Sequence, residues 1–162
     1  MQVLQSLEAN GKGIIIINQT HKDFSQATRE EIQWALANYL LVKGSHSYLA
    51  LMGYQEGGRI LRTPETSAPI GHALNSMYAS QGVAMRDFSS GLAIVNPSSR
   101  QSFVVSLPPG IYIDLYGNLV DEIPLEPLSG IVLLRKATSA YLHTPLNNTN
   151  LAFAAPLLTL FP

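Results

Sequence analysis

The chain of 162 residues contains no cysteine and carries little charge. Without thiols it has no disulfide bond, no thiolate metal site and no cysteine nucleophile. Charged residues make up only 13% of the sequence, whereas about a quarter is usual in soluble proteins. Hydrophobic residues make up 46%. We therefore expect a solid core and some apolar surface that another part of the protein covers.

A basic surface is lacking too. The net charge is −1, and the ten Lys and Arg residues are scattered along the chain. This distribution argues against nucleic acid and against an anionic membrane as partners. The first residues show no basic segment followed by an apolar one, so we expect no signal peptide. A bacterial cytoplasmic location and a secreted location both remain open.

The histidines and glycines form no cofactor motif. The four histidines are far apart in the sequence, and none forms a pair at the spacing of a zinc motif. They are His21, His46, His72 and His143. The stretch Gly11-Lys12-Gly13 precedes a predicted strand instead of following one, so it does not resemble a phosphate-binding loop. We expect neither a metal ion nor a cofactor.

The first third of the chain predicts one βαβ unit. Residues 1–13 are expected to form a short helical or irregular lead-in, and residues 14–17 are four isoleucines, which is typical of a strand buried on both faces. A polar loop over residues 18–23 leads toward a helix, and residues 48–52 form a second apolar run. A strand, helix and strand of these lengths form a parallel pair joined by a crossover helix.

The predicted helix has clear start and stop signals. Thr28 and Glu31 form a capping-box pattern, while Lys43 and Gly44 suit the last turn and the residue that follows it. Trp34 lies beside the main apolar stripe and is expected to pack against a neighbouring helix. The stripe itself follows helical spacing and consists of Ile32, Ala35, Leu36, Tyr39 and Leu40.

The second half of the chain predicts an antiparallel meander that begins near Val83. Strand-length runs that end at Gly, Pro, Asn or Ser are typical of a β-sandwich or a small barrel. The predicted strands are residues 92–95, 103–107, 111–115, 119–124 and 131–134. Asp114 and Asp121 flank a turn at residues 116–118, where hairpin chemistry accounts for them without a calcium ion.

Motifs in both halves resemble a known class of enzymes. The run TREEIQWALANYLLVKGSHSYLALMGY resembles the last helix and last strand of (β/α)8-barrel glycoside hydrolases. Arg86, Phe88 and Gly91, followed by Asn96-Pro97 and Ser129-Gly130, resemble the small β-sandwich behind the barrel in several microbial families of this kind. The resemblance covers residues 14–134.

This resemblance implies an α+β chain in four parts. Residues 1–58 are the C-terminal end of a (β/α)8 barrel, residues 59–82 a connector, residues 83–136 an antiparallel β-sandwich and residues 137–162 a tail. A whole barrel takes about 250 residues. The chain would then be a C-terminal fragment of a glycoside hydrolase that acts on a carbohydrate, inactive alone. Its partner would be the N-terminal barrel of the same protein, and Arg86 and Asp87 would either pair with the barrel piece or form an exposed pair.

The resemblance also points to side chains at the carboxyl ends of the two barrel strands, where barrel active sites lie. Asn18, His21 and Tyr54 suit hydrogen bonding to a sugar or stacking on it. Asp23 and Glu56 are the carboxylates expected at that face and the candidates for acid and base. Otherwise the catalytic carboxylates are expected on barrel strands outside this sequence.

A non-catalytic carbohydrate-binding or interaction module built on the sandwich is the alternative. It requires a line of exposed aromatic side chains on one face of a sheet. The candidates are Phe88, Phe103, Tyr112 and Tyr116, of which strand alternation buries two or more. Whether Tyr112 and Tyr116 share one solvent-exposed face distinguishes the two hypotheses.

Overall fold

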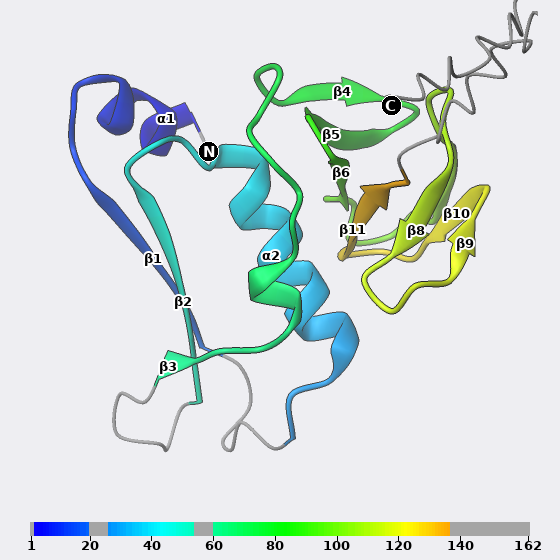
Figure 1. The fold of residues 1–162 in the computed structure, drawn as a ribbon, viewed down its shortest axis with the longest axis horizontal. Helices are drawn as coiled ribbons and strands as arrows, with labels where there is room; N and C mark the ends of the chain where they lie inside the picture. Colours follow the sequence, from blue (N-terminus) through cyan, green and yellow to red (C-terminus); the bar gives the residue numbers. More distant parts are fainter. Residues whose placement is uncertain (1, 20–25, 54–59, 137–162) are drawn as a thin grey trace, which may run out of the picture.

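The protein, seen in a computed structural model, is described over residues 2–19, 26–53 and 60–136. These residues form a mixed α+β fold in layers, in which one long helix lies between a small sheet and a larger antiparallel sheet (Figure 1). No helix in the described ranges is long and apolar enough to cross a membrane.

The small sheet confirms the predicted parallel pair. Helix α1 (Gln2–Ala9) precedes strand β1 (Ile14–Gln19), which pairs in parallel with β2 (Ser47–Met52). The short β3 (Ile60–Leu61) then pairs antiparallel with the last two residues of β2. The lead-in is thus helical, and β1 runs two residues further than the sequence pattern predicted.

The expectation that β1 is buried on both faces is wrong. Ile14 and Ile16 are half-buried, and Ile16 packs against the core of the helix layer, whereas Ile15 and Ile17 are more than half exposed. The helix covers only one face of this sheet (Figure 1), so the second face of an apolar strand has no cover within the described residues.

Helix α2 (Arg29–Val42) begins as the capping box predicts. The backbone N–H of Glu31 donates to Thr28 Oγ1 at 3.3 Å, and the Thr28 N–H donates back to Glu31 Oε2 at 3.0 Å. Its end differs, because Gly44 does not adopt the left-handed conformation of a glycine C-cap. Instead, the carboxylate of Glu8 occupies the space where a Cβ of residue 44 would lie.

The prediction of one apolar stripe on α2 describes only part of its burial. Nine of its residues are buried, because the helix is covered from two sides. Ile32 and Ala35 pack with Leu51 of β2, while Ala37 belongs to a core shared with the larger sheet. Trp34 is partly buried and packs at the edge of that shared core, while the neighbouring helix expected beside it stays a prediction.

The larger sheet is antiparallel and has six strands. Five of them are β4 (Tyr78–Ser80), β5 (Val83–Phe88), β6 (Gly91–Asn96), β8 (Tyr112–Asp114) and β9 (Leu119–Val120). The sixth, β11 (Ser129–Arg135), lies between β6 and β8, and the strand order is β4-β5-β6-β11-β8-β9. A two-stranded sheet of β7 (Phe103–Ser106) and β10 (Glu122–Leu125) packs on it across a second core. The pairing fits the predicted β-sandwich.

Residues 119–124 were predicted to form one strand, but the structure divides them between two strands. Leu119 pairs with β8 in the larger sheet, whereas Ile123 pairs with Val105 of β7 in the smaller one. The chain therefore changes sheets between β9 and β10. The predicted connector also contains structure, because β3, the 3-10 helix η2 (Glu65–Ser67) and β4 all fall within it.

Strand β6 explains how the layers adhere. Leu92 and Ile94 are buried in the core between the two antiparallel sheets, while the alternate residues Ala93 and Val95 are buried in the core shared with α2. All six residues of β6 are buried, which is the pattern of a strand covered on both faces. The helix approaches this sheet closely at Gly130, where an added Cβ would lie 3.0 Å from the Cβ of Ala37.

Candidate functional site

Four of the five predicted site residues lie outside the described residues, namely His21, Asp23, Tyr54 and Glu56, and their roles stay predictions. Asn18 is described and lies within β1 instead of the following loop. It is half-buried and shares the parity of Ile16, which places it on the side of the strand that faces α2.

Gln19 is a polar residue that the sequence pattern did not single out. It is the last residue of β1, it is exposed, and it pairs with Met52 at the carboxyl ends of the two parallel strands. The apolar run in the sequence ends at Ile17, so the pattern predicts no strand at Gln19 and gives no direction for its side chain. Four consecutive isoleucines gave no signal of where the strand stops.

Large apolar side chains gather on the face of the small sheet opposite to α2, which we call the open face. Ile15 and Ile17 lie two residues apart on β1 and share this face. Ile60 of β3 lies on the same face beside Met52. These three side chains are each more than half exposed, so the open face is suited to packing against another apolar surface.

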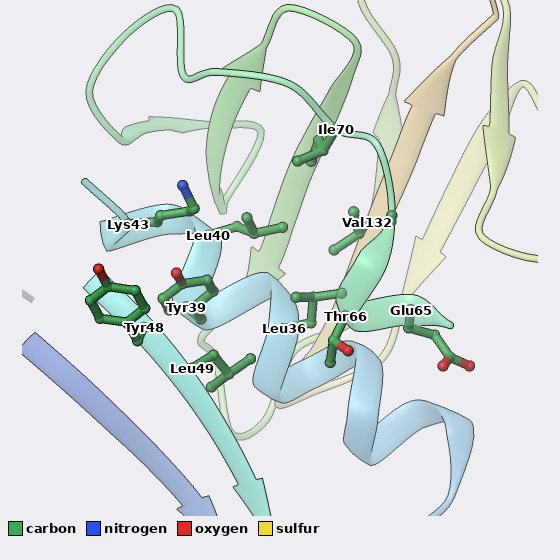
Figure 2. A pocket seen from close by; sticks show the side chains of 11 residues that line it. Leu36, Tyr39, Leu40, Lys43, Tyr48, Leu49, Glu65, Thr66, Ile70 and Val132 are labelled. Atoms are coloured by element: carbon green, nitrogen blue, oxygen red, sulfur yellow. The ribbon is translucent and has the colours of Figure 1, made fainter. Parts of the chain in front are cut away.

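A pocket of about 230 Å³ lies between α2, β2 and η2 (Figure 2). Its walls are mainly apolar, and Leu36, Leu49 and Val132 are examples. In Figure 2, Lys43 and Tyr48 lie toward one end, and Glu65 and Thr66 toward the other. Glu65 is the single carboxylate among the residues that line this pocket, whereas glycoside hydrolysis usually requires two.

Glu65 is held by hydrogen bonds. The Tyr116 hydroxyl donates to Glu65 Oε1 at 3.1 Å. Burial alone would raise the pKa of Glu65, but bonds from its own backbone N–H, from Thr63 and from Tyr116 outweigh burial and lower the pKa. Burial and, after it, the same contact with Glu65 raise the pKa of Tyr116. The hydrogen bond to Glu65 positions the Tyr116 side chain.

A larger groove, of about 640 Å³, lies between the N-terminal half of α2 and the sandwich. Its lining includes Trp34 from the helix, Tyr116 from the β8–β9 turn and Leu128 from the β10–β11 turn. Asp114 also lines it, but its Oδ1 accepts the backbone N–H groups of Tyr116 and Asn118, each at 2.8 Å. Although burial would raise the pKa of Asp114, these bonds and the Asn118 side chain lower it.

Arg86 fixes the sandwich to the end of α2. Its guanidinium Nη1 donates to the carbonyl oxygens of Leu40 at 3.0 Å, Leu41 at 3.3 Å and Lys43 at 2.6 Å. Its Nε donates to Asn75 O at 2.9 Å. Arg86 is buried, and burial lowers its pKa while Glu8 raises it. Of the two predicted alternatives for Arg86, contact with the βαβ unit is confirmed.

Comparison with known proteins decides the family. A model of the hypothetical glycosyl hydrolase family 15 matches residues 1–92, which is more than half of the chain. The chain belongs to this family. No curated protein matches it. The match confirms the expected kinship with glycoside hydrolases at the level of the family, and it extends from α1 through α2 into β6.

Membership in a hypothetical glycosyl hydrolase family directs attention to carboxyl groups, because two of them normally flank the bond that is cleaved. Hydrogen bonds lower the pKa values of Glu65 and Asp114 despite burial. The described residues of this family member mainly offer surfaces for packing and binding: the open face, the pocket and the groove.

Proposed function

We propose that this chain contributes the last two strands of a (β/α)8 barrel, their connecting helix and a β-sandwich to a glycoside hydrolase that acts on a carbohydrate. The observation that carries the proposal is the open face. A parallel strand pair has a helix on one side and large apolar side chains, nearly free of cover, on the other.

The geometry of a barrel accounts for this arrangement. In a (β/α)8 barrel the helices pack on the outside, and branched apolar side chains from every strand fill the interior. Ile15 and Ile17 have the positions of such interior residues, opposite to α2. Strand β3 pairs only with Leu51 and Met52, so residues 47–50 of β2 are available for a neighbouring strand.

The partner that the open face would meet is the N-terminal part of the barrel in the same protein. The catalytic carboxylates would then lie on other barrel strands. Gln19 and the predicted sugar contacts His21 and Tyr54 would border the sugar at the strand ends, whereas Asn18 lies on the side that faces α2, which is the outer side of such a barrel. Asp23 and Glu56 are retained as candidates for the acid and the base.

The sandwich would act as a structural accessory domain. Arg86 and the core shared with α2 join it to the barrel helix, which supports a stiffening role. The alternative, a binding module with a line of aromatic residues on one sheet face, loses its basis. Tyr112 is 1% exposed and Tyr116 is 39% exposed, and Phe88 is buried as well, so these residues do not share one solvent-exposed face.

The test is hydrolysis of a panel of polysaccharides by the protein that contains this chain, measured as released reducing ends. Ile17→Glu would place a carboxylate in the barrel interior. The packing that it removes contributes about 1–2 kcal/mol, and burying an unpaired charge costs several more. We expect the variant to lose hydrolysis together with solubility.

Val104→Glu is the matched control, because Val104 and Ile17 are both 59% exposed and Val104 lies on the outer face of the sandwich. This variant should hydrolyse as well as the wild type. Full activity of Ile17→Glu would refute the barrel packing. Failure of the wild-type protein to hydrolyse any glycan would refute the carbohydrate function.

A further inference from the structure

The groove between α2 and the sandwich has the size of a ligand site. Its volume of about 640 Å³ lies within the range of about 300–1,000 Å³ that is typical of small-molecule pockets. Two parts of the chain that are far apart in sequence form it, namely the first turns of α2 and residues 114–131 of the sandwich. A ligand bound there would contact both layers of the protein.

Tyr116 is presented to this groove in a fixed orientation. Its hydroxyl donates to Glu65, and the guanidinium carbon of Arg29 lies 4.3 Å from the centre of its ring. The Arg29 guanidinium therefore covers one face of the Tyr116 ring. Because Tyr116 remains 39% exposed, part of the ring is left for a ligand. An aromatic ring that is fixed before binding loses little conformational entropy when a ligand stacks on it.

Leu128 adds a second apolar surface, and its backbone is unusual. It has a φ of +52°, in the left-handed region that non-glycine residues rarely adopt. Its backbone N–H donates to Ser98 O at 2.9 Å, which holds this conformation. The side chain lines the groove and is 53% exposed, so its own burial does not offset the strain. Strain of this kind is often kept where a side chain meets a ligand.

The charges of the groove select the kind of ligand. Four carboxylates line it, from Glu30, Glu31, Asp114 and Glu126, against the single guanidinium of Arg29. Anionic ligands are therefore disfavoured. Carboxylate oxygens accept hydrogen bonds, and each can accept more than one. An apolar floor bordered by acceptors suits a molecule with C–H faces and many hydroxyl donors.

We propose that this groove binds a neutral oligosaccharide, at a site separate from the carboxyl ends of β1 and β2. The hydrophobic faces of the sugar rings would lie on Tyr116 and Leu128, and their hydroxyls would donate to the carboxylates. The choice of a sugar as ligand rests on the proposed glycoside hydrolase function. The groove begins at the N-terminal turns of α2, the helix that follows β1 in the chain.

The experiment is a titration of the full chain with neutral cello-, malto-, xylo- and manno-oligosaccharides. Trp34 is the only tryptophan and it lines the groove, so its fluorescence reports occupancy there, with calorimetry as an independent measure. We expect saturable binding to at least one series. Tyr116→Ala should weaken it about tenfold, which corresponds to the loss of one dominant contact.

Leu128→Gly provides a variant that keeps the fold. Glycine adopts a φ of +52° without strain, so the thermal stability should not fall, while the affinity should fall by about threefold or more because an apolar contact is lost. Leu74→Gly is the control. Leu74 is 55% exposed and lies outside the groove, so its loss should leave the affinity unchanged.

Binding that neither Tyr116→Ala nor Leu128→Gly weakens would place the sugar elsewhere and overturn the proposal. Tighter binding of a polyuronate, or binding of a lysine-rich peptide without any sugar, would overturn it as well. Polysaccharide hydrolysis by the protein that contains the chain, without any oligosaccharide binding to the groove, would reject the groove and leave the proposed function standing. Groove binding without hydrolysis of any polysaccharide would reject the proposed hydrolase function and leave the groove standing.

Discussion

The Arg86 contact offers a sharp test of how the layers of this protein depend on one another. Arg86→Met keeps most of the aliphatic length and removes the guanidinium. The carbonyl oxygens of Leu40, Leu41 and Lys43 then lose their common donor, and Asn75 O loses another. The three helix carbonyls lie at the end of α2, where no further turn of the helix supplies N–H donors.

The expected cost follows from these contacts. A hydrogen bond to a charged group contributes about 1.5–3 kcal/mol, but three of the four bonds share one Nη1 and are not additive. Removing the guanidinium also removes the cost of its desolvation. We expect a net loss of about 2–4 kcal/mol in the free energy of unfolding, which is a large share of the 5–15 kcal/mol that is typical of a domain.

The assay is urea unfolding followed by two signals. Trp34 fluorescence reports the contact of α2 with the larger sheet, and far-ultraviolet circular dichroism reports the whole chain. Because α2 and the larger sheet share one core, both signals should show the same midpoint before and after the change. Arg100→Met, at an exposed arginine, should cost less than about 0.5 kcal/mol.

Two results would refute this reasoning. If Arg86→Met costs no more than Arg100→Met, the four hydrogen bonds are not a net source of stability. If the fluorescence midpoint separates from the dichroism midpoint in the wild type, the helix and the sandwich unfold independently, and the shared core does not unite them. Arg86→Lys should recover part of the loss, because it restores the charge without the fork of donors.

Two further predictions concern the sandwich. In the folded protein, hydrogen bonds lower the pKa of Asp114 despite burial. The contribution of Asp114 to stability is therefore present above the unfolded carboxyl pKa and is lost as the pH falls through the folded value. Asp114→Asn should cost about 1 kcal/mol at neutral pH and flatten the acid limb of a stability–pH curve, whereas an unchanged acid limb would contradict the assignment. Gly130→Ala places a methyl group 3.0 Å from the Cβ of Ala37 and should cost about 1–3 kcal/mol in thermal unfolding. In the Gly130→Ala/Ala37→Gly double variant, the loss of unfolding free energy should be smaller than the sum of the losses in the two single variants. Strict additivity would mean that the helix shifts freely.

Local signals in the sequence predicted local structure well. The capping box at Thr28 and Glu31 uses two residues three positions apart, so it forms whatever surrounds the helix. The turn at Asp114 is similar, because its carboxylate bonds to backbone groups within four residues. The strands at β6 and β11 were also evident, since both are apolar runs between turn residues.

Features that depend on distant partners were predicted poorly. The burial of Ala37 on a second side of α2 requires a sheet whose strands begin far along the chain. The division of residues 119–124 between two sheets depends on their pairing with β8 and β7. The groove depends on Tyr116 meeting the first turns of α2, and no periodicity in the sequence contains that information.

The low charge content can now be traced to particular surfaces. Part of it comes from α2 and β6, which are each covered on two sides. The rest of the exposed apolar surface lies on the open face, where Ile15, Ile17 and Ile60 take positions that a solvated sheet would give to polar residues. If that face is only a liability, Ile17→Glu should improve solubility at no cost to function. If it is an interface, as we propose, the same substitution should abolish hydrolysis, so one variant separates an apolar surface that is merely exposed from one that is normally covered.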